Sequence, residues 1–212
     1  MSEYTFRNKM FRGFLFANIG VATIATILIL SKPDEPPLIQ GVLLPEARPI
    51  SAFTLIDHNF QPFTQENLKG QWDLISYGFA TCPDICPTTL VMMNELNEFL
   101  LDTPYAEDTQ FLMVSLDPAR DTPIKLKPYI EYFNSDFIGV TGEFLSIHRF
   151  AKQLNVAFQK IVTNAETGDY TVDHSGHIAL INPDGYFQGY YKPPFDLNRF
   201  LMTYKSLRAS YD

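Results

Sequence analysis

Two thiols define the first candidate site. Cys82 and Cys86 are the only cysteines of this 212-residue chain and stand four positions apart. They follow an apolar run that ends at Phe79 and precede a segment whose helical period begins near Thr88. A helix start offers free N–H groups and a partial positive charge, which favour a thiolate and lower the pKa of a cysteine. The four-residue spacing can bring both sulfurs within reach of each other or of one ion.

A structural disulfide is the plainer interpretation of this pair. It would close an interval of only three residues, so it would remove little chain entropy from the unfolded state. Redox chemistry or metal binding is therefore favoured. Two thiolates suit a soft ion such as Cu(I), or zinc.

A trigonal copper site needs a third ligand, and histidine is the natural candidate. His58 falls in a predicted hairpin turn and is expected to be solvated, while His148 is expected on the surface of a helix. His174 and His177 come directly before a predicted strand at residues 178–181. Either of these two could serve as the ligand.

Alternating elements must position these side chains. Apolar runs predict buried strands, and apolar residues at a period of 3.6 predict helices. The expected order is strand 72–79, helix 88–101, strand 110–116, helix 123–133, strand 137–140 and helix 143–154. Such a β-α-β-α-β-α order requires a parallel sheet with helices on both faces.

Shorter strands flank this alternating region. Residues 53–63 predict an N-terminal β-hairpin, and residues 156–162 are expected to pair with residues 170–172. A second hairpin is expected over residues 178–191, followed by a closing helix from Leu197. The whole predicts an α/β fold of thioredoxin-like type, with a central sheet, flanking helices, an N-terminal hairpin and inserted strands.

The N-terminal region predicts a membrane anchor. Residues 13–30 are uncharged and largely apolar; about 20 residues at roughly 1.5 Å each cross the hydrocarbon core of a bilayer. Basic residues precede the run, so residues 1–12 are expected in the cytoplasm and residues 31–212 outside. A cleaved signal peptide is disfavoured because small residues are missing where cleavage would occur. We expect a single-pass protein of a bacterial inner membrane with its domain in the periplasm.

Proline enrichment at residues 31–50 predicts a stiff linker before a folded domain at residues 51–212. The net charge of −8 and the pI of about 4.9 argue against nucleic-acid binding. An oxidising compartment would permit a disulfide between the cysteines. The chain is expected to act as a monomer.

Three motifs resemble one protein family. Residues 77–90, YGFATCPDICPTTL, are similar to the signature of the Sco/SenC/PrrC copper proteins. Residues 114–123 resemble the second motif of that family, and residues 172–175 with 181–185 resemble its third. The motifs occur in the family's order, and the similarity covers roughly residues 45–210.

The resemblance implies that Cys82, Cys86 and His174 bind one copper ion as Cu(I) or Cu(II). Family members assist assembly of the dinuclear copper centre of cytochrome c oxidase, by donating copper, by reducing the cysteines of that subunit, or both. The implied partners are the copper-bearing oxidase subunit and a copper donor protein. The chain departs from the family at Gly176-His177, where His177 is either an extra weak ligand or a surface group.

Acidic residues accompany the implied site, since Asp117 and Asp173 match acidic positions near the family's metal centre. Two other functions use the same cysteines. One is a tethered thiol–disulfide oxidoreductase without metal, and the other is a redox or copper sensor. A peroxiredoxin is disfavoured because Phe79 and Pro83 stand where a Thr or Ser should precede the reactive cysteine. No classical enzyme activity is expected beyond thiol–disulfide exchange.

Overall fold

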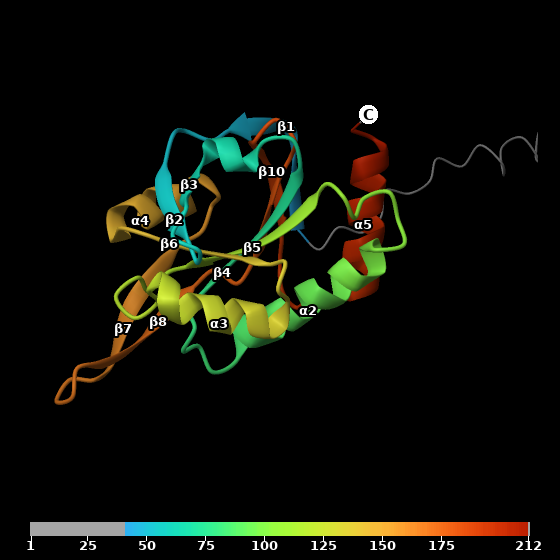
Figure 1. Ribbon diagram of the computed structural model, residues 1–212. Coiled ribbons are helices and arrows are strands. Elements are labelled where there is room, and N and C mark those ends of the chain that lie inside the picture. Colours follow the sequence, from blue (N-terminus) through green and yellow to red (C-terminus); the bar gives the residue numbers. More distant parts are fainter. Residues whose placement is uncertain (1–40, 212) are drawn as a thin grey trace, which may run out of the picture. The chain divides into compact units, whose positions relative to one another are not determined.

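The computed structural model describes residues 41–211 as an eight-stranded sheet with helices and a separate two-stranded sheet (Figure 1). The elements are β1 (Gly41–Pro49), β2 (Thr54–Asp57), β3 (Pro62–Thr64), the short 3-10 helix η1 (Gln65–Leu68), β4 (Trp72–Gly78), α2 (Ile85–Leu100), β5 (Thr109–Ser115), α3 (Pro123–Phe133), β6 (Ile138–Thr141), α4 (Phe144–Gln153), β7 (Phe158–Asn164), β8 (Asp169–His174), β9 (Ile178–Ile181), β10 (Tyr186–Tyr191) and α5 (Leu197–Ala209). The large sheet has the order β1-β10-β9-β4-β5-β6-β2-β3. The predicted α/β class is confirmed.

The centre of the sheet carries the site. Every residue of β4 is buried, and β4 pairs in parallel with β5 from Trp72 opposite Thr109 to Gly78 opposite Ser115. Strand β6 continues the parallel part on the far side of β5. Helix α2 connects β4 to β5, and α3 connects β5 to β6. The cysteines follow the carboxyl end of β4, and in open α/β sheets functional sites gather at this edge.

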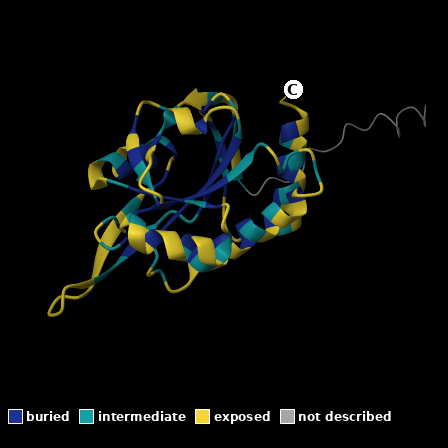
Figure 2. Cartoon of the chain, viewed as in Figure 1, coloured by how far each residue is buried: buried dark blue, intermediate teal, exposed yellow. Residues whose placement is uncertain are grey.

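Two apolar clusters cover the two faces of the sheet, which is dark blue in Figure 2. Leu74 of β4 packs in one cluster with Met93 of α2 and Ile130 of α3. Its neighbour Ile75 points the other way, into a cluster that includes Phe150 of α4. This alternation follows from the two-residue period of a strand. The expected helices on both faces are thus confirmed.

The N-terminal boundary of the domain differs from the prediction. Gly41–Pro49 is not linker but the edge strand β1, which pairs antiparallel with β10. The proline-rich composition misled because an edge strand tolerates residues without an N–H. Pro45 falls where the register shifts between Leu43 and Arg48, so it interrupts no regular ladder. The folded unit therefore begins before residue 51.

The predicted cytoplasmic segment at residues 1–12, the span at residues 13–30 and the first half of the linker lie outside the described residues. Within residues 41–211, none of the helices has the length and apolar character needed to cross a bilayer.

The second sheet consists of β7 and β8 alone. These strands pair antiparallel, from Phe158 opposite His174 to Asn164 opposite Asp169, as the sequence predicts. No backbone ladder joins them to the large sheet among the described strands. The tip of this hairpin is exposed (Figure 2). His174 therefore comes to the site on an element that the main sheet does not fix.

Asp73 of β4 supplies a test of the buried sheet. Its side chain is 0% exposed, one carboxylate oxygen lacks a partner, and the other faces the Gln71 amide at 3.5 Å. Burial raises its pKa well above the ordinary value, against the smaller opposing effect of Gln71. The folded state thus holds the proton more tightly, and stability falls as pH rises above the unfolded pKa of about 3.9.

We expect Asp73→Asn to mimic the protonated form and to raise the free energy of unfolding at pH 7 by about 1–3 kcal/mol. At pH 4 the gain should be much smaller, because the folded carboxyl is then protonated and the unfolded one, with a pKa of about 3.9, is already about half protonated. Urea unfolding at the two pH values measures the difference, and Asp136→Asn, at an exposed position, is the control. A loss of stability at pH 7 would mean that the carboxylate is ionised and stabilised in the folded protein.

Candidate metal centre

The two cysteines lie on different local structures. The Cys82 N–H donates to the Phe79 carbonyl oxygen at 3.0 Å, which turns the chain directly after β4. Helix α2 begins at Ile85, three residues earlier than predicted, with Asp84 at its N-cap position. Cys86 therefore lies in the first helical turn, whereas Cys82 precedes the helix. The loop at residues 79–84, rather than a helical face, brings the two thiols together.

Cys86 is the buried member of the pair, at 4% exposure. Gly78 makes this burial possible, because a Cβ at that position would lie 2.7 Å from the Cys86 sulfur. Burial raises the pKa of the Cys86 thiol, and the neighbouring Cys82 raises it further, against a backbone contact at Phe79 that lowers it. The expected lowering of this pKa at a helix start is therefore wrong for Cys86, since desolvation outweighs the helix terminus.

Cys82 is partly exposed, and both thiols are free rather than joined in a disulfide. The pair is thus asymmetric, with one accessible and one enclosed sulfur. Such a pair can accept a metal or exchange with an external thiol through Cys82 first.

His174 completes the group from the end of β8. Its Nε2 lies 3.8 Å from the sulfur of Cys86. Its Nδ1 lies 3.1 Å from the Ser175 carbonyl oxygen, to which it must donate because a carbonyl only accepts. When the ring is neutral, its single proton therefore lies on Nδ1, and the lone pair of Nε2 faces the sulfur. The Phe79 ring stands edge-on to the imidazole at 6.4 Å between centroids.

The 3.8 Å separation matches two ligands of one trigonal ion. Bond lengths of about 2.3 Å to sulfur and 2.0 Å to nitrogen, with an angle near 120°, place the two atoms roughly 3.7 Å apart. Within residues 41–211, however, no three His, Cys, Asp or Glu side chains are gathered closely enough to hold an ion without adjustment. Cys82, which lies on the loop before α2, is the nearest candidate for a third donor.

The remaining histidines are engaged elsewhere. His58 is buried, against the prediction, and its Nδ1 accepts the Gly139 N–H at 2.8 Å while burial lowers its pKa. His177 is also buried, and its Nε2–H donates to the Leu154 carbonyl oxygen at 3.2 Å. His177 is thus no surface group. His148 is exposed, as predicted.

Gly176 explains the departure from the family pattern. A Cβ there would lie 2.9 Å from the Ile85 side chain and 3.4 Å from Pro193. Glycine therefore lets the histidine segment press against the first residue of α2, one position before Cys86. This role of Gly176 follows from its contact with Ile85, which the sequence alone does not show.

Two charged residues near the site, Arg120 and Asp121, were not identified from the sequence, although Asp117 beside them was. Asp117 is buried and pairs with Arg120, so it is no free carboxylate beside the thiols. Asp121 is also buried and accepts the Ala80 N–H at 2.9 Å, which fixes the chain two residues before Cys82. The clustering of charge in Asp117–Asp121, directly after a buried strand, was the available signal.

Comparison with known proteins finds relatives that are named for copper binding or as SCO2-like proteins. A relative from Stutzerimonas stutzeri, whose name proposes that it binds copper, is 44% identical over 158 residues, which is 74% of this chain and 76% of the relative. The SCO2-like protein of Rickettsia conorii is 35% identical over 187 residues, covering 86% of this chain and 90% of its own length.

Solved structures agree. The ScoI protein of Arabidopsis thaliana with copper bound is 30% identical, with a TM-score of 0.69 over 76% of this chain and 98% of that one. Yeast Sco1 with copper bound is 32% identical, with a TM-score of 0.70 over 78% of this chain and 91% of that one. These likenesses confirm the thioredoxin-like α/β fold for the part of the chain that the structure describes.

The SCO1/SenC family profile matches residues 44–207. This match spans the whole candidate centre, from the cysteine loop through the histidine strand. The family resemblance carried by the three sequence motifs is therefore confirmed, and the chain belongs to the SCO1/SenC family.

Proposed function

We propose that this chain binds one copper ion through Cys82, Cys86 and His174 and assists assembly of the dinuclear copper centre of cytochrome c oxidase. The observation that carries the proposal is the approach of the His174 Nε2 to the Cys86 sulfur at 3.8 Å. The copper found in the related ScoI and Sco1 structures supports the choice of ion. Residues 13–30 would tether the domain to the outer face of a bacterial inner membrane.

Copper is cargo in this proposal. Two thiolates favour Cu(I), and the imidazole keeps Cu(II) acceptable. The thiols must release their protons to bind. Burial opposes the ionisation of Cys86 without the metal, so we assign first capture to the partly exposed Cys82 and closure of the site to Cys86 and His174. The donor is a copper-carrying protein, and the acceptor is the copper-bearing oxidase subunit.

Thiol–disulfide exchange is the second candidate function. The exposed Cys82 beside the enclosed Cys86 resembles an attacking and a resolving thiol. The same pair could reduce the cysteines of the oxidase subunit before metal transfer, or report redox state to a partner as a sensor. Dependence on His174 separates these functions, because exchange between sulfurs needs no imidazole ligand.

Removal of the imidazole tests the ligand set. We expect His174→Ala to lower Cu(II) affinity by at least about 100-fold, which exceeds the usual effect of losing a residue that only contacts a ligand. The affinity for Cu(I) should fall less, because the two thiolates favour that ion. Competition titrations with chelators of known affinity measure both. Cys82→Ser and Cys86→Ser should weaken both ions.

The matched control is His148→Ala, which removes an exposed histidine. It should bind copper like the wild type. Equal Cu(II) affinity in the His174 variant and the wild type would remove His174 from the site and favour the metal-free thiol functions.

The asymmetry of the thiols predicts their order of modification. Iodoacetamide should alkylate Cys82 at least about tenfold faster than Cys86, because the buried thiol reacts only after local opening. Peptide mass spectrometry at short times measures the two rates, and one equivalent of Cu(I) should slow both. Similar rates without copper would mean that the cysteine loop opens freely.

Gly78 predicts a steric test of the same pocket. Gly78→Ala should displace the Cys86 sulfur, lower copper affinity about tenfold and reduce the free energy of unfolding by about 1–3 kcal/mol through overpacking. Gly142→Ala is the matched control, since its Cβ would lie 2.9 Å from Leu55, away from the thiols. The control should lose stability but keep its copper affinity; an equal loss of affinity in both variants would contradict a specific role for Gly78.

A further inference from the structure

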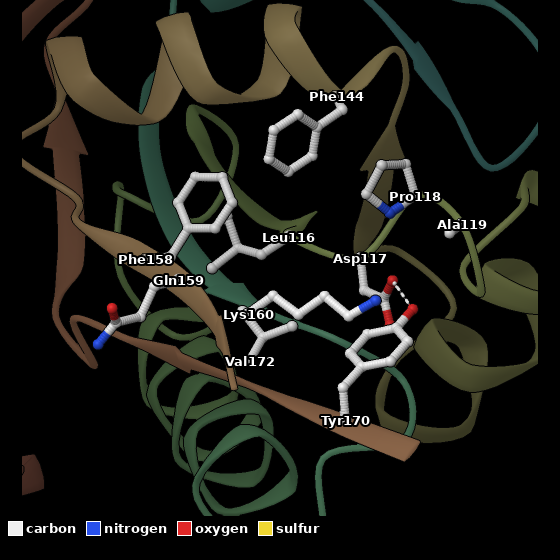
Figure 3. A pocket seen from close by; sticks show the side chains of 10 residues that line it. All are labelled: Leu116, Asp117, Pro118, Ala119, Phe144, Phe158, Gln159, Lys160, Tyr170 and Val172. Atoms are coloured by element: carbon white, nitrogen blue, oxygen red, sulfur yellow. Dashed lines mark hydrogen bonds between the residues drawn. The ribbon is translucent and has the colours of Figure 1, made fainter. Parts of the chain in front are cut away.

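The strand that carries His174 needs an anchor outside its own sheet. Strands β7 and β8 pair only with each other, and most of β7 is exposed (Figure 2). Apolar packing on one side is incomplete, because a hollow of about 300 Å³ lies beside Phe144 of α4, Phe158 of β7 and Tyr170 of β8 (Figure 3). Val172 is the buried residue of β8 in the main core, and polar contacts add to this anchor.

Tyr170 makes these contacts, four positions before His174. Its hydroxyl donates to the buried carboxylate of Asp117 at 2.8 Å (Figure 3). Arg120 donates through Nη1 to the Tyr170 carbonyl oxygen at 3.2 Å, and its guanidinium lies 4.0 Å from the centre of the tyrosine ring. Arg120 also pairs with Asp117. Asp117 and Arg120 both belong to the loop between β5 and α3, whereas Lys160, which lies 3.7 Å from the centre of the Tyr170 ring, belongs to β7 of the same small sheet.

The same loop holds the cysteine side of the centre. Asp121 is 1% exposed and accepts both the Ala80 N–H at 2.9 Å and the Ser115 hydroxyl at 2.6 Å. The Arg120 guanidinium lies 5.6 Å from the centre of the Phe79 ring, which in turn faces His174. The cysteine loop and strand β8 are thereby both joined to the same stretch of backbone that follows β5.

We propose that the loop at residues 117–121, here named the bridge loop, sets the distance between the cysteine loop and His174. Asp117, Arg120 and Tyr170 are positioning residues for the histidine, and Asp121 is the positioning residue for the cysteines. The inference rests on the proposed copper function, because it assigns a purpose to the separation of those ligands.

The physical basis is the strength of hydrogen bonds that involve charged groups in a partly buried setting. They exceed neutral bonds in strength, and their loss leaves an unsatisfied buried carboxylate. Two such bonds act on one tyrosine, so the position of β8 depends on the charge pair within the bridge loop. A metal ligand held in this way can be displaced without breaking a backbone ladder.

The test is Tyr170→Phe, which removes one oxygen atom from a half-buried ring and keeps its apolar packing. In the metal-free protein, amide exchange over residues 169–174 should accelerate about tenfold, the ratio that about 1.4 kcal/mol of lost interaction produces. The Cu(II)-loaded protein should show a weaker imidazole nitrogen signal in electron paramagnetic resonance. Tyr132→Phe, at an 83% exposed ring, is the control and should match the wild type in both.

A double-mutant cycle with Asp117→Asn makes the assignment specific. If the hydroxyl acts through Asp117, the double variant should exchange about as fast as the faster single variant; independent, multiplying effects would overturn the inference. Asp121→Asn should instead accelerate alkylation of the cysteines while leaving exchange in β8 unchanged.

The outcomes separate this inference from the proposed function. If wild-type Cu(II) binding depends on His174 but Tyr170→Phe behaves like the wild type, the bridge loop has no positioning role and the copper function stands. If the imidazole signal is missing from the wild type itself, the ligand set fails, and faster exchange in the Tyr170 variant would then show an anchor for β8 alone.

Discussion

The approach of the Cys86 sulfur to the His174 Nε2 is the contact on which the centre depends, and it joins residues 88 positions apart in the chain. Small residues make it possible on both sides. Gly78 leaves room for the sulfur at the end of β4, and Gly176 lets the histidine segment lie against Ile85. Side chains at these two positions would press on the elements that carry the ligands. The centre is therefore built by close packing around glycines as much as by its ligands.

Burial of Cys86 then sets the chemistry of the pair. A helix start by itself favours a thiolate, but the enclosed sulfur loses more from desolvation than it gains there, and its pKa rises. The raised pKa thus keeps the Cys86 thiol protonated in the metal-free site, next to the His174 ring. A cation bound at the proposed site would reverse this balance, because its charge would replace the missing solvation. Ligation and deprotonation of Cys86 would then be coupled, and the partly exposed Cys82 would be the point of entry.

The sequence predicted the parts of this structure that local patterns govern. Strand β4, helix α3 and the β9–β10 hairpin follow from apolar runs, a proline at a helix start and an Asn-Pro-Asp-Gly turn. Long-range pairing was less accessible: β1 reads as a proline-rich linker because its partner β10 lies far along the chain. The burial of His58 and His177 was missed for the same reason, since their hydrogen-bond partners, Gly139 and Leu154, lie on elements distant in the sequence. The motifs named Cys86 and His174, but only the fold supplies their distance and the raised pKa of the thiol.

The support of the two proposed ligands, Cys86 and His174, differs in kind, and this difference would suit the proposed release of copper. Cys86 stands on a long helix whose buried apolar residues, such as Leu90 and Met93, pack in the cluster on one face of the main sheet, so many apolar contacts fix its position. His174 stands on a two-stranded sheet whose tie to the core includes Tyr170 and the charged residues of the bridge loop. Local opening proceeds where few apolar contacts must be broken, so the histidine side yields before the cysteine side. The bonds from copper to the imidazole and to Cys82 would then break first, and the enclosed sulfur of Cys86 would be the last ligand to dissociate.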